Sequence, residues 1–266
     1  MARRLASTQL TIFFKVVKEG FIMAFDPTAF QAPSTGNRCM PVVLLLDVSG
    51  SMDGKKIDRL YESVKMMIET FASKSSNEEL PYKVAIITFG AKVECHTRYT
   101  DAKHLTSLPR FYADGMTPLG TALRMAKAMV EDKEETKSRW YKPAVVVVSD
   151  GYPNDDWQEP ERAFIEEGRS AKCQRLAVAI GNDADENMLK GFVSKPEFFF
   201  KAGDADKLVS VFEKVTISIQ NDAVTQKSDV DKKNDDKKET ASSKVSTTPT
   251  TSRRRAAVSD DDEQWI

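Results

Sequence analysis

An apolar run that ends abruptly in an acid limits what this chain can fold into. Residues Val42 to Leu46 read VVLLL and are followed at once by Asp47. A strand without alternating polar residues is typical of a parallel sheet that helices cover on both faces. Asp47 then lies at the carboxyl end of the strand, and this edge of an open α/β sheet is where ligands bind. The run therefore predicts a buried parallel strand with a functional group at its carboxyl end.

Three side-chain oxygens follow that strand in a short loop. Asp47, Ser49 and Ser51 alternate in the sequence DVSGS, and Gly50 gives the backbone freedom to turn them toward one point. No nitrogen or sulfur ligand is among them. Carboxylate and hydroxyl oxygens are hard ligands, which suit Mg²⁺ or Mn²⁺ better than zinc or copper. We therefore expect Mg²⁺ or Mn²⁺ as the cofactor.

The pattern D-x-S-x-S resembles the metal-ion-dependent adhesion site (MIDAS) of von Willebrand factor A (VWA) domains. The resemblance implies two more ligands, a Thr from a second loop and an Asp after a later strand. The segment DGMTPLG, which contains Thr117, is similar to the family's threonine loop, and VVVVSDG, which contains Asp150, is similar to its second aspartate motif. Three motifs in order are more specific than D-x-S-x-S alone. The implied metal ligands are Asp47, Ser49, Ser51, Thr117 and Asp150.

The resemblance also implies how such a site works. Ser49, Ser51 and Thr117 would supply neutral oxygens, while Asp47 and Asp150 act directly or through water. Mg²⁺ prefers near-octahedral oxygen coordination and readily retains waters. One open position then remains for an Asp or Glu of a partner protein, so we expect a protein-binding adaptor and not an enzyme. Each residue taken alone has an ordinary alternative role, as a strand-end acid, a turn former or a helix cap.

The rest of the chain alternates helical and strand patterns. Apolar residues recur every three or four positions from Ile57 to Phe71, while residues 82–89 read as a strand with residues 93–96 as its hairpin partner or neighbour. This alternation predicts an α/β fold with a Rossmann-like, doubly wound, mainly parallel sheet flanked by helices. The further expected helices lie near 118–130, 164–165, 188–192 and 208–215, and the further strands near 144–148, 176–180 and 197–201.

Composition changes at both ends of this region. Residues 24–40 contain Pro and Gly without periodicity, and from Gln220 onward Lys, Asp, Ser and Thr predominate without a core-facing period. We expect a flexible N-terminal extension at residues 1–40, the VWA domain at 41–219 and a disordered charged tail at 220–266. The tail ends in an acidic cluster beside Trp265, which is either a docking motif or a solvating segment.

Charge and cysteine usage limit the class of function. The 266 residues carry 39 basic and 40 acidic side chains, a formal net charge of −1, which argues against nucleic acid as a partner. No apolar stretch approaches transmembrane length, so we expect no membrane partner. Cys39, Cys95 and Cys173 are widely spaced and odd in number. Such usage fits reduced thiols in the cytoplasm better than a disulfide framework.

Enzymatic interpretations fit the same residues less well. A phosphate-binding loop needs more residues between its two glycines than separate Gly50 from Gly54. In addition, Lys56 stands where such a loop has the Ser or Thr that binds Mg²⁺. A serine hydrolase would need Gly where Asp47 precedes Ser49. An aspartyl phosphatase resembles the loop more closely, yet Ser49 replaces the second acid and so removes the usual proton donor. A Mg²⁺-dependent phosphatase is therefore the less favoured alternative.

Residues Trp140 to Trp157, WYKPAVVVVSDGYPNDDW, resemble bacterial TerY-type VWA proteins of tellurium resistance. The resemblance spans about residues 41–219 and implies a cytoplasmic adaptor in a stress-response system with protein phosphatase or kinase partners. Some relatives carry a C-terminal zinc ribbon, whereas residues 220–266 contain none of the Cys and His that such a ribbon needs, and Met116 replaces a small residue before the threonine. Asp155 and Asp156 are expected to be solvated or to start a helix. A VWA subunit of an AAA+ ATPase machine, using the same metal face, is the alternative.

Overall fold

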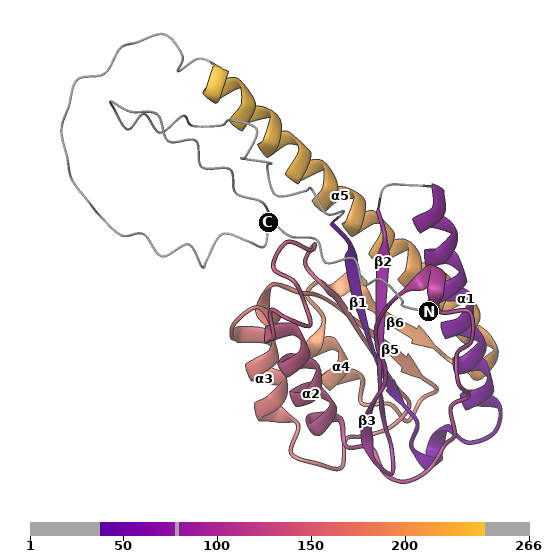
Figure 1. Cartoon of the computed structure of the whole chain (residues 1–266). Helices are drawn as coiled ribbons and strands as arrows, with labels where there is room; N and C mark the ends of the chain where they lie inside the picture. The colour runs from indigo at the N-terminus through magenta and orange to yellow at the C-terminus, as the bar shows by residue number, and fades with distance from the viewer. Residues whose placement is uncertain (1–37, 78–79, 243–266) are drawn as a thin grey trace, which may run out of the picture. The chain divides into compact units, whose positions relative to one another are not determined.

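The central feature of the fold is one six-stranded sheet with the strand order β3-β2-β1-β4-β5-β6 (Figure 1). The structure is a computed structural model that describes residues 38–77 and 80–242. Neighbouring strands are parallel except for β3, which runs antiparallel to β2. This arrangement confirms the expected mainly parallel α/β sheet. The strands are β1 (Met40–Asp47), β2 (Tyr82–Phe89), β3 (Val93–Asp101), β4 (Ala144–Ser149), β5 (Gln174–Ile180) and β6 (Phe199–Ala202).

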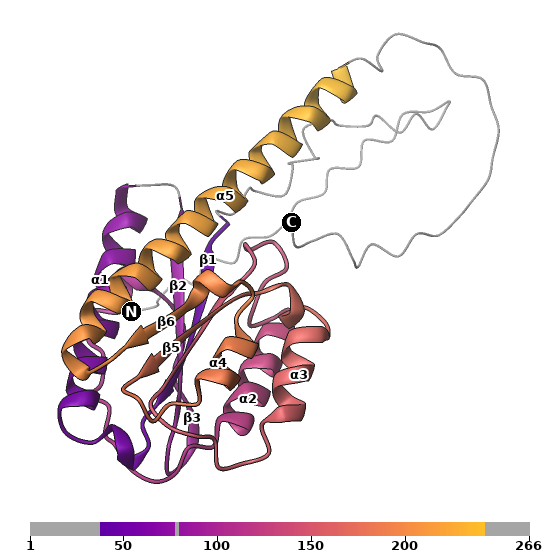
Figure 2. The ribbon, with the colours of Figure 1, turned by 180° about the vertical axis from the view of Figure 1, so that it is seen from behind.

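Helices cover both faces of this sheet (Figures 1 and 2). Helices α1 and α5 contribute to the core on one face, and α2, α3 and α4 contribute to the core on the other. Neighbours along β1 alternate between the two cores, with Leu44 on the first face and Leu45 on the second. Both faces are apolar, which explains why this strand has no polar alternation. The helices are α1 (Lys55–Asn77), α2 (Leu119–Glu131), α3 (Gln158–Glu166), α4 (Glu186–Phe192) and α5 (Leu208–Ser242).

Helix α5 differs most from the sequence prediction. It continues through the expected boundary at residues 219 and 220 as far as Ser242. Ala223 is fully buried and Val230 is 4% exposed, and both belong to the core that α1 and α5 share. The Gln226 side chain accepts a hydrogen bond from the backbone N–H of Lys142 at 2.7 Å. The expected disordered tail is therefore wrong for residues 220–233, because a sparse stripe of buried positions suffices where only one side of a helix is covered.

Other sequence predictions fall outside the described residues. These are the N-terminal extension up to residue 37 and the acidic cluster beside Trp265. Within the described ranges, no helix combines the length and the apolar character needed to cross a membrane.

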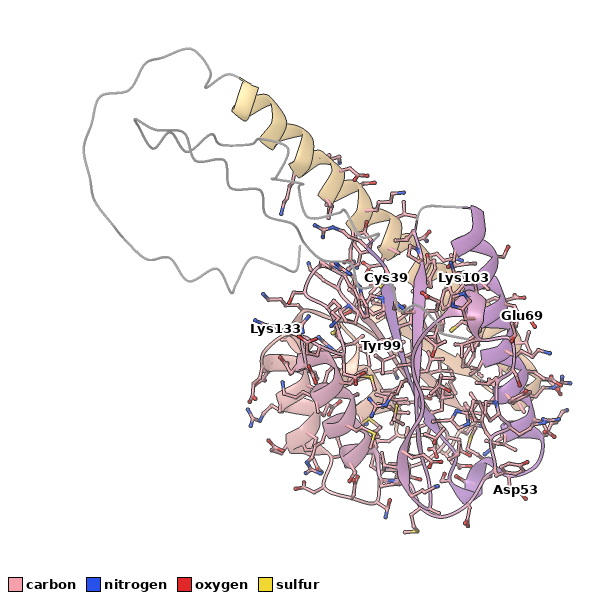
Figure 3. The ribbon with its side chains drawn as sticks, viewed as in Figure 1. Cys39, Asp53, Glu69, Tyr99, Lys103 and Lys133 are labelled. Atoms are coloured by element: carbon pink, nitrogen blue, oxygen red, sulfur yellow. The ribbon has the colours of Figure 1, made fainter. Side chains whose placement is uncertain are left out.

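The three cysteines are free thiols. Cys39 lies just before the amino end of β1. Asp53 lies at the opposite end of the sheet, after the loop that follows the carboxyl end of β1 (Figure 3). Burial raises the pKa of Cys39 and of Cys173 to about 12, so neither thiol is poised to react as a thiolate. The chemistry of interest therefore lies at the carboxyl edge of the sheet.

Candidate metal centre

The carboxyl ends of β1 and β4 lie side by side where the strand order reverses. The two strands pair in register, with Leu46 opposite Val148, so that Asp47 and Ser149 end neighbouring strands. From β1 the chain passes to α1 on one face, and from β4 it passes to α3 on the other. Chain segments that diverge in this way leave a crevice at the strand ends, and that is where ligands bind in open α/β sheets.

Asp47 is fully buried at this point. One carboxylate oxygen accepts a hydrogen bond from the backbone N–H of Ser49 at 2.9 Å, and the other accepts one from the Ser149 hydroxyl at 2.6 Å. Burial raises the pKa of Asp47 to about 6, while the hydrogen bonds from Ser149 and Ser49 oppose the rise and the charge of Asp150 adds to it. A nearby cation would favour the ionised form.

Ser49, Ser51 and Asp150 place their oxygens at ligand-like spacings. The two hydroxyl oxygens are 3.0 Å apart, and the Ser51 hydroxyl donates to Oδ1 of Asp150 at 2.7 Å. Neighbouring ligands of an octahedral Mg²⁺ ion with bonds of about 2.1 Å lie about 3.0 Å apart. The pair Ser49–Ser51 and the pair Ser51–Asp150 are therefore each spaced as adjacent ligands of one such ion would be.

Thr117 reaches the same place from the second loop and is 7% exposed. A methyl group placed on Gly151 would lie 3.8 Å from Oγ1 of Thr117 and 3.9 Å from Oγ of Ser51, so both hydroxyls border the glycine after Asp150. The Thr117 carbonyl accepts hydrogen bonds from the N–H groups of Leu119 and Asn154, at 2.9 and 3.1 Å. The threonine loop is thus held against the loop that follows β4.

The donor set fits Mg²⁺ or Mn²⁺. The five expected ligands supply three hydroxyl oxygens and two carboxylates, all of them hard donors. Within the described part of the chain, no three His, Cys, Asp or Glu side chains gather as a metal site. The hydroxyls are consequently needed to complete a coordination shell. The structure brings the five side chains to one edge, and their role as ligands remains a prediction.

The sequence did not predict the roles of two residues beside the candidate metal centre. Ser149 hydrogen-bonds the buried carboxylate of Asp47, and its only sequence signal is its place at the end of a strand beside β1. The ammonium group of Lys56, at the start of α1, lies 2.5 Å from Oδ2 of Asp150. A positively charged group therefore already contacts one of the two acids.

Asp155 starts a helix, as expected, but the helix is not the one that follows it. Its carboxylate accepts hydrogen bonds from the backbone N–H groups of Gly120 and Thr121, both at 2.8 Å, at the beginning of α2. A methyl group on Gly120 would come within 2.8 Å of the Trp157 Cα, so only glycine permits this close approach. Asp156 is exposed, as expected. The segment from Asp155 to Trp157 thus anchors α2 beside the metal centre.

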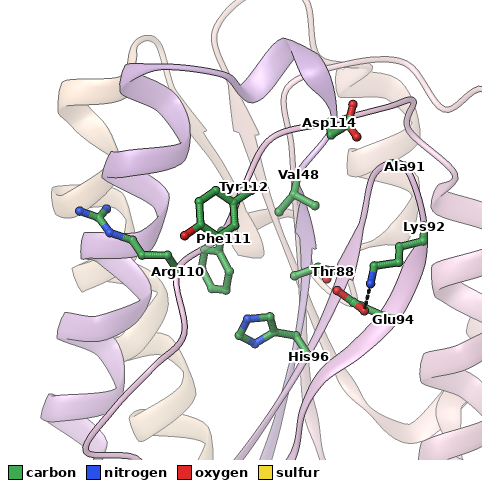
Figure 4. A pocket seen from close by; sticks show the side chains of 10 residues that line it. All are labelled: Val48, Thr88, Ala91, Lys92, Glu94, His96, Arg110, Phe111, Tyr112 and Asp114. Atoms are coloured by element: carbon green, nitrogen blue, oxygen red, sulfur yellow. Dashed lines mark ion pairs between the residues drawn. The ribbon is translucent and has the colours of Figure 1, made fainter.

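A cavity of about 290 Å³ adjoins the metal centre on the side of β2 and β3 (Figure 4). Val48, which lies between two expected ligands, forms part of its wall, as does Asp114 at the start of the threonine loop. The His96 ring meets the Phe111 ring edge to face, with 5.1 Å between centroids. The complete lining is Val48, Thr88, Ala91, Lys92, Glu94, His96, Arg110, Phe111, Tyr112 and Asp114.

Comparisons with known proteins agree with this architecture. The family model of the von Willebrand factor type A domain matches residues 42–214. Proximal thread matrix protein 1 from the mussel byssus, with a zinc-occupied MIDAS motif, is 15% identical with a TM-score of 0.55, over 68% of this chain and 48% of that one. The ArnB paralog VWA2 from Sulfolobus acidocaldarius is 20% identical with a TM-score of 0.51, over 65% and 44%.

A third similar structure is the vWF domain of the type V pili tip protein Mfa5 from Porphyromonas gingivalis. It is 12% identical with a TM-score of 0.54, over 69% of this chain and 96% of that one. At such identities the likeness concerns the fold alone. The chain spans about half the length of the first mussel and archaeal structures that it matches. No curated protein sequence matches it significantly. The match of the family model, over most of the described sheet and helices, shows that this chain belongs to the von Willebrand factor type A domain family.

Proposed function

We propose that this protein is an adaptor that binds a partner protein through a divalent cation, with an Asp or Glu of the partner completing the coordination. The observation that carries the proposal is the convergence of five oxygen-bearing side chains from three separate segments at one edge of the sheet. Ser51 is exposed, whereas Asp47, Ser49 and Asp150 are at most 1% exposed. An ion bound there would be held from inside and accessible from outside.

The surface around this opening favours a protein partner. Tyr112, Met116 and Tyr152 are 80, 63 and 68% exposed, and they belong to the loops that carry Thr117 and Asp150. Among the described residues only two other large apolar side chains are comparably exposed, and both lie on α5. Exposed apolar groups gathered at one place are typical of a protein interaction site. We therefore expect the partner's acid to be flanked by apolar side chains.

The adjoining cavity supports the same kind of partner. Its wall includes the rings of Phe111 and Tyr112, and its volume of about 290 Å³ can accept one large side chain (Figure 4). Lys92 in the wall is paired with Glu94 at 2.6 Å, so its charge is compensated. We place an apolar or aromatic side chain of the partner there, next to the residue that reaches the metal.

The charges on this face make the cation necessary for an acidic partner. Asp53, Asp114 and Asp156 are exposed, and none of them forms an ion pair with another described residue. Uncompensated carboxylates repel an approaching Asp or Glu, whereas a divalent ion attracts it. Removal of the ion should therefore turn attraction into repulsion, and partner binding should depend on the metal.

The biological system is inferred from one segment of the sequence. We assign the protein to a cytoplasmic stress-response system of the tellurium-resistance type, with phosphatase or kinase partners, because residues 140–157 resemble TerY-type proteins. Asp155 and Trp157 of that segment pack against α2, so their presence is also explained by the fold. A subunit of an AAA+ ATPase machine remains the alternative, because it would use the same metal face.

The test uses one hydroxyl and a matched control. Thr117→Ala removes an expected ligand without changing charge, and Thr121→Ala removes a threonine hydroxyl that contacts Asp155 instead. Calorimetric titration with Mn²⁺ should show affinity reduced about tenfold or more in Thr117→Ala, the loss of one metal ligand, and little change in Thr121→Ala. Partner capture should fail with EDTA and with Thr117→Ala. Unchanged capture in both cases would show that the metal bridge is wrong even though the fold is right.

A further inference from the structure

The position of Lys56 in α1 is not one that favours a positively charged side chain. It is the second residue of α1, and the N-terminus of a helix favours acids over cations. Its ammonium group lies 2.5 Å from Oδ2 of Asp150 and 3.2 Å from the carbonyl oxygen of Ser51. Both contacts are with residues of the candidate metal centre, and the contact with Asp150 spans 94 positions in the sequence. The site, and not the helix, therefore explains this lysine.

The ion pair solves a problem that the site would otherwise have. The Asp150 side chain is fully buried, and an ionised carboxylate in that position is costly without a counter-charge. Among the described residues, its other oxygen, Oδ1, accepts a hydrogen bond only from a neutral hydroxyl, that of Ser51. The Lys56 side chain is 31% exposed, so its flexible aliphatic part extends from the solvent side and brings the ammonium group to the buried carboxylate.

We infer that Lys56 is a built-in competitor of the metal, which neutralises Asp150 when no divalent ion is bound and opposes the binding of one. A divalent ion on the same carboxylate would stand beside the ammonium group, and two like charges in a partly buried site repel strongly. Binding therefore requires either that the lysine leaves or that the repulsion is borne. In both cases the metal binds less tightly than its oxygen ligands alone would allow.

This inference deepens the proposed function and rests on its metal centre, although it requires no particular partner. A weakened site fills and empties as the concentration of free divalent ion changes, whereas a tight site stays filled. Partner binding through the ion would follow the same concentration. Lys56 would thus make the adaptor conditional on the supply of metal.

The neighbouring lysine provides a matched control. Lys55 lies in the same helical turn and carries the same charge, but it pairs with Asp206 at 2.6 Å, and the side chains of that pair are 63 and 56% exposed. Substitution of either lysine by Met removes one positive charge from the start of α1. Any difference between the two variants reports the contact with Asp150.

The experiment titrates the full chain and the variants Lys56→Met, Lys56→Gln and Lys55→Met with Mn²⁺ and with Mg²⁺ by calorimetry. Both Lys56 variants should bind the ions about tenfold to a hundredfold more tightly than the original chain, and Lys55→Met should stay within about threefold. In EDTA, Lys56→Met should melt at a lower temperature than Lys55→Met, because Asp150 loses its counter-charge, and saturating Mg²⁺ should abolish this difference. Lys56→Gln keeps a hydrogen-bond donor and serves if Lys56→Met does not fold without metal.

The outcomes separate this inference from the proposed function. Tighter binding in both Lys56 variants, or binding in those variants alone, supports the competitor role. Equal or weaker binding in the Lys56 variants overturns that role and leaves the metal centre intact. If neither the original chain nor any variant binds Mn²⁺ or Mg²⁺, the metal centre is wrong, and the proposed function and this inference fail together.

Discussion

Gly115 and Gly54 share a backbone conformation but differ in what surrounds them. Their φ angles are +77° and +74°, a region that residues with a side chain rarely adopt. A methyl group on Gly115 would come within 2.8 Å of the Ala91 Cβ and closer still to the Ala91 backbone, whereas one on Gly54 would meet nothing within 4 Å. The Gly115 carbonyl also accepts a hydrogen bond from the N–H of Gly50 at 2.9 Å.

The two glycines lead to a paired prediction. Gly54→Ala should cost only the backbone strain, about 1–2 kcal/mol of unfolding free energy. Gly115→Ala should cost about 2–4 kcal/mol and weaken Mn²⁺ binding as well, because the overlap with Ala91 displaces the threonine loop. Urea denaturation and calorimetric titration of both variants provide the measurement. Equal losses of stability with unchanged metal affinity would show that the loop tolerates the shift.

Glu161 should make stability depend on pH. It is 9% exposed, and Oε1 has no hydrogen-bond partner among the described residues. Burial, with a smaller contribution from Asp185, raises the pKa of Glu161 from an ordinary 4.5 to about 7. The folded protein holds the carboxyl proton of Glu161 more tightly than the unfolded chain does. The stabilisation of the folded state by protonated Glu161 is therefore fully present below about pH 4.5 and is lost as the pH rises through about 7.

The matching variant isolates that contribution. Relative to Glu161→Gln, which does not titrate, the original chain should lose about 2–3 kcal/mol of unfolding free energy between pH 4.5 and pH 8. Urea denaturation of both proteins across this range measures the difference. Parallel pH profiles would show that Glu161 keeps an ordinary pKa in the folded state.

Helix α5 holds the sheet with residues beyond the boundary that composition predicts. Truncation after Gln220 removes buried Ala223 and Val230 together with the Gln226 contacts to Lys142. Unfolding free energy should fall by about 2–4 kcal/mol, which corresponds to about 5–15 °C in melting temperature. Truncation after Lys233 keeps all of these contacts and should change the melting temperature little. If both truncated chains melt like the full chain, this part of α5 contributes no packing energy.

A bound divalent ion should stabilise the whole domain, because its expected ligands come from segments as far apart as Asp47 and Asp150. An ion that binds only the folded state adds about 2.7 kcal/mol at a concentration one hundred times its Kd, or about 5–10 °C in melting temperature. Thermal melting with Mg²⁺ and then with EDTA should show this shift and its reversal. Asp47→Asn should abolish it. A melting temperature that ignores both treatments would contradict the metal centre.

Local patterns predicted those features whose cause lies within one segment. The uninterrupted apolar run before Asp47 predicted a strand buried on both faces, and β1 has core residues on both sides. The three-four spacing from Ile57 to Phe71 predicted α1, because a helix that covers a sheet needs an apolar stripe along one side. The resemblance of three short motifs to VWA domains predicted the five expected ligands, which the structure places at one edge.

Contacts between distant segments could not be predicted from the sequence. Ser149 supports Asp47 from 102 positions away, and Asp155 caps α2 from 35 positions away, because strand order and loop packing bring them together. The extension of α5 was missed for the same reason, since its few buried positions are apparent only when the neighbouring segment is known. No periodic pattern within one segment indicates which distant residue a side chain will contact.

The amino-acid sequence by itself determined the fold class, the family and the identity of the expected ligands, because periodicity and short motifs act through neighbouring residues. Only the tertiary structure decided that a lysine from the start of α1 contacts Asp150 and that Tyr112, Met116 and Tyr152, in the loops that carry Thr117 and Asp150, are exposed. The physical reason is that charge compensation and exposure depend on which surfaces meet, and folding brings together groups that the chain keeps far apart.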